Sequence, residues 1–110
     1  MEKKINVLGT DYEIVTNVNE KDDPYIADCD GYIDYTNKKI HISEMSEYGW
    51  SDNQYHENTV IRHELVHAFL YESGLNVNSD WARNEEIVDW IALQAPKLNK
   101  LFEELNINND

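Results

Sequence analysis

The sequence contains a pair of histidines, His63 and His67, spaced four residues apart within an apolar stretch. On an α-helix, such side chains share one face and lie about 5–6 Å apart at Cβ, so both imidazoles can bind one ion. Glu64 is turned by about 100° from His63, too far round to ligate comfortably but near enough to reach a water at the ion. The motif therefore predicts a zinc site on a helix, with Glu64 as general base.

The residues around this motif predict a helix that is buried nearly all round, because they are almost all apolar. They are Val60, Ile61, Leu65, Val66, Ala68, Phe69 and Leu70. Ser51 followed by Gln54 is a capping-box candidate, and Gly74 fits a C′ position, so we expect the helix from about residue 53 to 73. His56 lies seven residues before His63, about 10 Å along the axis, and is expected at the rim of the site rather than as a ligand.

Length and composition predict one domain spanning residues 1–110, with 41% hydrophobic residues to form one modest core. The apolar run near the N-terminus is too short for a signal peptide or a membrane span, so we expect a soluble, cytoplasmic protein that does not bind membranes. The net charge of −13 repels phosphate backbones and argues against nucleic-acid binding. Cys29 is the only cysteine, which excludes an intrachain disulfide and a thiolate zinc site.

Two strand pairs are expected before the helices. Residues 4–8 and 12–18 flank Gly9-Thr10-Asp11 and indicate a hairpin. Residues 31–36 and 40–43 flank a polar turn, with Ile40 and Ile42 facing one way and His41 the other. Three or four short strands thus precede the helices.

A second helix is expected over residues 81–94, after a loop at 75–80. Glu85 is in phase with Val88 and Ala92, and Asp89 follows one turn on, so a face packed on the first helix would bring two carboxylates inward. One of them can supply the third protein ligand that catalytic zinc needs, and the other can orient a histidine ligand. Acidic residues are also common in the first turn of a helix, which is the alternative explanation for Glu85 and Glu86.

Pro96 is expected to end this second helix or to open a third one. Apolar residues recur beyond it at helical spacing and are most simply core cover. They are Leu98, Leu101, Phe102 and Leu105.

His63-Glu64-x-x-His67 followed by Asn84-Glu85-x-x-x-Asp89 resembles the gluzincin arrangement of two His ligands, one Glu ligand and an orienting Asp. The runs 67–69 and 89–92, together with the small size, are more similar to ImmA/IrrE-type zinc metallopeptidases and their small phage-encoded relatives. The resemblance covers roughly residues 55–96. It implies His63, His67 and Glu85 as ligands of one zinc ion, Glu64 as base and Asp89 as the orienting carboxylate, with Glu86 as a substitute for Glu85.

The fold class expected from these features is α+β and zincin-like: three or four strands in a small antiparallel or mixed sheet, packed on about three helices, with the motif on the first long helix. The expected function is zinc-dependent hydrolysis of peptide bonds in a peptide or protein substrate, by a metal-activated water with Glu64 as general base. Tyr71, Tyr35 and His41 are candidates for stabilising the oxyanion, although packing explains Tyr71 better.

Two alternatives stay open. The first is a non-catalytic binding module with a structural zinc ion, although such a site has no need of Glu64. The second is an acidic interaction protein that uses its charge to bind a basic partner, which leaves the histidine pair without a role.

Overall fold

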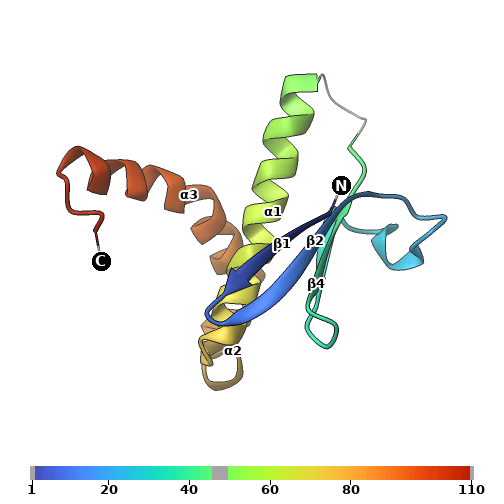
Figure 1. Ribbon diagram of the computed structural model, residues 1–110, viewed down its shortest axis with the longest axis horizontal. Coiled ribbons are helices and arrows are strands. Elements are labelled where there is room, and N and C mark those ends of the chain that lie inside the picture. The colour runs from blue at the N-terminus through green and yellow to red at the C-terminus, as the bar shows by residue number, and fades with distance from the viewer. Residues whose placement is uncertain (1, 46–49, 110) are drawn as a thin grey trace.

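The computed structural model describes residues 2–45 and 50–109, with the backbone alone for residues 50–52. The chain forms an α+β fold in which a four-stranded mixed sheet, ordered β1-β2-β4-β3, lies beside helices α1, α2 and α3 (Figure 1). This agrees with the α+β class expected from the sequence. None of the helices in the described ranges is long and apolar enough to cross a membrane.

The first strand pair is an antiparallel hairpin of β1 (Glu2–Val7) and β2 (Thr10–Val18). Its turn is Leu8-Gly9, and both residues have positive φ, 49° and 97°. Two-residue turns of this kind match the right-handed twist of the strands they join. The turn is therefore tighter than the predicted Gly9-Thr10-Asp11, and residues 10 and 11 belong to β2.

The second pair, β3 (Gly31–Asp34) and β4 (Lys39–Ser43), is also antiparallel. Ile40 and Ile42 are fully buried on one face of β4, as the alternation predicted. β4 also pairs with β2, in parallel, with Ile14 opposite Ile40. The crossover between them passes through a short 3-10 helix, η1 (Pro24–Ile26), and places β3 at an edge of the described sheet.

The motif lies on α1 (Trp50–Glu72). The prediction that Ser51 caps this helix is wrong, because α1 already includes Trp50. The Gln54 side chain instead donates a hydrogen bond to Asn58 Oδ1, one turn along the same helix, at 2.9 Å. Pairs of this kind add a little stability within a helix but do not accept hydrogen bonds from the free backbone N–H groups at its N-terminus.

The C-terminal end of α1 is as predicted. Gly74 has a φ of 88°, and its N–H donates to the carbonyl of Tyr71 at 3.1 Å. A left-handed residue at this position stops a helix and favours glycine, because a Cβ would be strained there.

Apolar residues from the sheet and α1 form the main core, and a smaller cluster lies between α1 and the segment that follows it. The main cluster is Val7, Tyr12, Ile14, Ile40, Ile42, Val60 and Ala68, and the smaller one is Leu70, Ala82 and Val88. The prediction that α1 is buried nearly all round is wrong, since Phe69 is 53% exposed. The sheet covers one side of α1 and the later segment another, which leaves Phe69 facing solvent.

The segment after α1 is more helical than predicted. The expected loop contains α2 (Leu75–Asn78), and Trp81 lies in a second 3-10 helix, η2 (Asp80–Arg83). The following helix, α3 (Glu85–Glu104), begins four residues later than expected. Asn84 sets this start, because its side chain accepts a hydrogen bond from the N–H of Ile87 at 3.0 Å, as an N-cap residue does.

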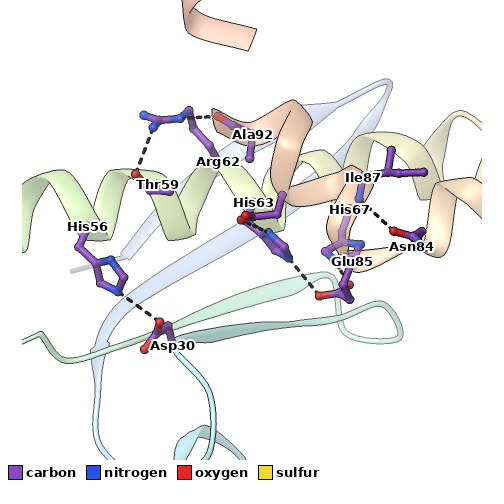
Figure 2. Close-up of polar contacts among 11 residues, drawn as sticks. Asp30, His56, Thr59, Arg62, His63, His67, Asn84, Glu85, Ile87 and Ala92 are labelled. Atoms are coloured by element: carbon purple, nitrogen blue, oxygen red, sulfur yellow. Dashed lines mark hydrogen bonds and ion pairs between the residues drawn. The ribbon is translucent and has the colours of Figure 1, made fainter. Parts of the chain in front are cut away.

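The predicted break at Pro96 is wrong, because α3 continues through it. Proline has no N–H to donate to the carbonyl four residues earlier, which is that of Ala92. Arg62 supplies a substitute from α1: its Nε donates to the Ala92 carbonyl at 3.0 Å (Figure 2). The Ala92 carbonyl, which has no N–H donor at Pro96, therefore accepts a hydrogen bond from Arg62 on α1 instead.

Beyond Pro96, α3 extends away from α1 and the sheet (Figure 1). The apolar residues expected to cover the core are exposed instead, which corrects that prediction. Their exposed fractions are 51% for Leu98, 56% for Leu101, 40% for Phe102 and 72% for Leu105.

Candidate metal centre

His63 and His67 lie on the side of α1 that faces α3, and both are largely buried. Their side chains are 17% and 10% exposed. The two rings meet edge to face, with centroids 4.9 Å apart. The four-residue spacing thus brings both imidazoles to one place, as helix geometry requires.

The carboxylate of Glu85 lies between the two rings. His63 Nε2 is 3.2 Å from Glu85 Oε2, and His67 Nε2 is 2.7 Å from Glu85 Oε1. Figure 2 shows both imidazoles pointing toward this carboxylate, which comes from the first turn of α3. The structure therefore brings together the three residues expected as metal ligands.

Asp89 lies one turn further along α3, and its Oδ1 is 3.3 Å from His63 Nδ1. The two carboxylates were expected to point inward, but the side chains of Glu85 and Asp89 are 72% and 53% exposed. Val88 and Ala92 form the buried line of α3 instead. Glu85 and Asp89 flank that line and reach the histidines at the edge of the contact between the helices.

Glu86 is exposed, and its side chain makes no hydrogen bond or ion pair within the described ranges. One residue along a helix is a turn of about 100°, so Glu86 is directed away from the histidines when Glu85 faces them. The geometry thus favours Glu85 over its neighbour.

Glu64 is 6% exposed and lines a cavity of about 260 Å³ together with His63, Glu85 and Asp89. Burial raises the pKa of Glu64 to about 7; the neighbouring His63 opposes this shift, whereas the charge of Glu85 adds to it. The carboxyl group thus lies beside the histidine pair without lying between the rings.

Burial also affects His67, where it disfavours the charged imidazolium and lowers the pKa. The carboxylate of Glu85 acts in the opposite direction, and His63 adds to the lowering. A lowered pKa favours the neutral imidazole, which is the form that binds metal ions.

The donor set fits a zinc ion. One ligand atom from each of His63, His67 and Glu85 lies within 4.8 Å of the other two. Ligand atoms at a tetrahedral zinc ion are about 3.3 Å from one another, since each bond is about 2.0–2.1 Å. Two imidazoles and one carboxylate also leave a fourth position open, as catalytic zinc sites do.

Three residues, Tyr71, Tyr35 and His41, were candidates for stabilising the oxyanion. For Tyr35, the carboxylates of the site affect the pKa of the hydroxyl group. Burial raises the pKa of Tyr35 to about 12, and the carboxylates of Glu64 and Glu85 contribute to the shift. Its ring stacks on Tyr71 with centroids 4.3 Å apart, so Tyr71 packs as expected. Tyr35 therefore keeps its hydroxyl proton at neutral pH.

Two features of the site were missed by the sequence reasoning. Arg62 bonds α1 to α3 next to His63, and Asp30 pairs with His56 at 3.2 Å on the rim of the cavity (Figure 2). Pro96 could have indicated the Arg62 hydrogen bond, because a proline within a helix leaves the carbonyl four residues earlier without its usual N–H donor. Asp30 lies 26 residues from His56, and no local pattern indicates their contact.

Comparisons of the chain with protein-family models, curated proteins and solved structures gave no match.

Proposed function

We propose that this protein is a zinc metallopeptidase of the zincin type, which hydrolyses peptide bonds in a polypeptide substrate. The observation behind this proposal is the meeting of His63 and His67 at the Glu85 carboxylate, 3.2 and 2.7 Å away, with Glu64 buried beside them. When bound, a zinc ion supplies a Lewis acid that polarises a carbonyl and makes water more acidic.

Each residue has a defined task in this proposal. Glu64 takes a proton from the attacking water and later gives it to the leaving amine. Asp89 accepts a hydrogen bond from His63 Nδ1, which fixes the tautomer and leaves Nε2 free to bind metal. Tyr35 donates its hydroxyl proton in a hydrogen bond to the substrate carbonyl oxygen as negative charge develops there.

The sheet offers a place for the substrate. β3 lies at an edge of the described sheet, and Gly31 at its start lines the same cavity as Glu64 and His63. An edge strand has backbone groups available to pair with an extended peptide. A peptide laid along β3 would pass directly beside the proposed catalytic base.

The first test is the metal content of the purified chain after zinc addition, measured by elemental analysis and by titration. About one zinc ion per chain is expected, and His63→Ala should abolish binding. His56→Ala is the matched control, because it removes an imidazole from the same face of α1 two turns away and should leave binding intact. Failure of the wild-type chain to bind zinc would refute the metal centre.

The second test is hydrolysis of unstructured peptides by the zinc-loaded chain, read by mass spectrometry. Glu64→Gln should keep the zinc ion and lose turnover, because glutamine cannot accept the proton. Cleavage that persists in this variant would exclude Glu64 as the base. Zinc binding without any cleavage by the wild-type chain would favour a non-catalytic binding module.

A further inference from the structure

The C-terminal half of α3 is a helix without tertiary support. Every residue from 95 to 109 is exposed, and this part of α3 extends away from α1 and the sheet (Figure 1). A free helix of about ten residues is marginal in water, because intrinsic propensity rarely offsets the entropy lost on ordering it. Most helices of this length are stabilised by packing along an apolar face.

The end of this exposed helix is nevertheless capped. Asn106 has a positive φ of 56°, and its N–H donates to the carbonyl of Glu103 at 3.0 Å. The N–H of Ile107 donates to the carbonyl of Phe102, also at 3.0 Å. These two hydrogen bonds form a Schellman motif, which satisfies carbonyl groups at the end of a helix. The exposed half of α3 therefore ends at a defined residue rather than fraying.

An apolar face runs along this half of α3. At about 100° per residue, its four large apolar side chains lie within an arc of about 100°. They are Leu98, Leu101, Phe102 and Leu105, which are 51%, 56%, 40% and 72% exposed. At about 180 Å² for a whole leucine or phenylalanine, these fractions correspond to roughly 400 Å² of apolar surface. Contiguous apolar patches of this size are often interaction sites.

The charges beside the apolar face complement those of a second copy of the chain. Lys97 and Glu104 are seven residues apart, so both flank the face on the same side. Neither side chain forms an ion pair within the described ranges. If two copies of this helix pack antiparallel, Lys97 of each copy lies opposite Glu104 of the other. The same two opposite-charge contacts then form twice, as the two-fold symmetry of a dimer requires.

The overall charge also favours this segment as the place of contact. Residues 95–105 contain two lysines and two glutamates, whereas the whole chain has a net charge of −13. Two copies repel one another over most of their surface and least where each is locally neutral. Antiparallel packing also places the acidic bodies of the two copies at opposite ends of the helix pair, which keeps the repelling charges apart.

The apolar area is sufficient for a weak dimer. The faces of two copies together supply roughly 800 Å² of apolar surface. Standard interfaces bury about 1,200–2,000 Å² in total, and a little more than half of that area is apolar. The helix pair thus reaches the lower end of this range, which corresponds to association at micromolar concentration.

We propose that this protein forms a dimer through antiparallel packing of the C-terminal halves of α3, with the apolar face at the interface and Lys97 paired with Glu104 across it. Glu85 precedes Leu98 by 13 residues, which is about 20 Å along a helix. The dimer therefore leaves the candidate metal centre uncovered. Neither zinc nor hydrolysis enters into this pairing, so its test is independent of the proposed function.

The test is sedimentation equilibrium of the full chain over about 2 to 300 µM. The mass should rise from 12.9 kDa at low concentration toward twice that value. Leu101→Glu should weaken dimerisation by more than about 100-fold, because it places a carboxylate in the apolar contact of both copies. Leu8→Glu is the matched control: Leu8 is also 56% exposed but lies in the β1–β2 turn, so this variant should dimerise like the wild type.

Two outcomes of this experiment would overturn the proposal. A wild-type chain that is monomeric at every concentration would leave the apolar face to a different protein. A dimer that survives Leu101→Glu would place the contact between copies elsewhere on the chain.

Charge reversal tests the antiparallel arrangement. Lys97→Glu and Glu104→Lys should each weaken dimerisation about tenfold, since either change creates two like-charge contacts across the interface. Both changes together restore opposite charges between the copies, and the dissociation constant should return to within about threefold of the wild-type value. The two positions are about 10 Å apart on one helix, so this recovery cannot arise within a single chain. A double variant that dimerises no better than the single ones would refute the arrangement.

Discussion

Replacing Arg62 with methionine should destabilise the protein by about 2 kcal/mol, through the carbonyl that Pro96 leaves without a helical donor. Arg62 Nε donates to the Ala92 carbonyl at 3.0 Å, and Ala92 is 1% exposed, so water cannot easily replace the lost donor. A buried carbonyl left without a partner costs about 1–3 kcal/mol. Methionine keeps much of the apolar stem, so the loss reports mainly on the hydrogen bond.

Pro96→Ala provides the control, because alanine restores an N–H that can donate to the Ala92 carbonyl within α3. The cost of Arg62→Met should then fall below about 1 kcal/mol in the Pro96→Ala background. The coupling energy in this double-mutant cycle should therefore be about 1 kcal/mol or more, well above the 0.3–0.5 kcal/mol scatter of independent sites.

The measurement is urea unfolding of the zinc-free proteins followed by circular dichroism, with thermal unfolding as a second readout. A loss of about 2 kcal/mol should lower the midpoint temperature by roughly 8 °C in a domain of this size. Equal costs of Arg62→Met in both backgrounds would refute the assignment of Arg62 as the substitute donor. Zinc affinity should fall in parallel, because this bond joins the two helices that supply the ligands.

Three further predictions concern the sheet and the site. Glu72 accepts hydrogen bonds from Tyr12 at 2.6 Å and Thr10 at 2.8 Å, which together with Lys38 hold its pKa below the ordinary 4.5. The stabilisation by the ionised Glu72 carboxylate is complete above that value and is lost as pH falls through the lower folded-state pKa, so Glu72→Gln should cost about 1 kcal/mol at pH 7 and progressively less as the pH falls below 4.5. Gly31→Ala would place a Cβ 2.8 Å from Val60 Cγ1, and overpacking of this kind should cost about 1–3 kcal/mol. Tyr35→Phe should lower kcat about tenfold or more with little change in KM, if its hydroxyl stabilises the oxyanion.

Each of these three predictions would be contradicted by a specific result. For Glu72, a destabilisation that does not decrease as the pH is lowered from 7 until the carboxylates are protonated would exclude the ionised carboxylate as its source. For Gly31, the cost of Gly31→Ala should be smaller in a chain that also carries Val60→Ala than in the wild-type chain. An equal cost in both backgrounds would show that the contact with the Val60 side chain is not the cause. For Tyr35, a rise in KM with unchanged kcat would indicate substrate binding rather than oxyanion stabilisation. Urea unfolding and steady-state kinetics supply these measurements.

Features that depend on near neighbours along the chain could be predicted from the sequence. The four-residue spacing of His63 and His67 places both rings on one helix face, and Gly74 ends that helix through its left-handed conformation. The alternation around Ile40 and Ile42 gave the buried face of β4. These features follow from local backbone geometry, which a short window of sequence contains.

Features that depend on contacts between distant segments could not be predicted locally, because they follow from how the helices and strands pack. Whether Glu85 or Glu86 faces the histidines depends on how α3 is rotated against α1, and 18 or more residues separate each from His67. The parallel pairing of β2 with β4 was likewise invisible in the local pattern. Pro96 shows the physical reason most clearly: its effect on the helix depends on a donor, Arg62, that local propensity cannot include.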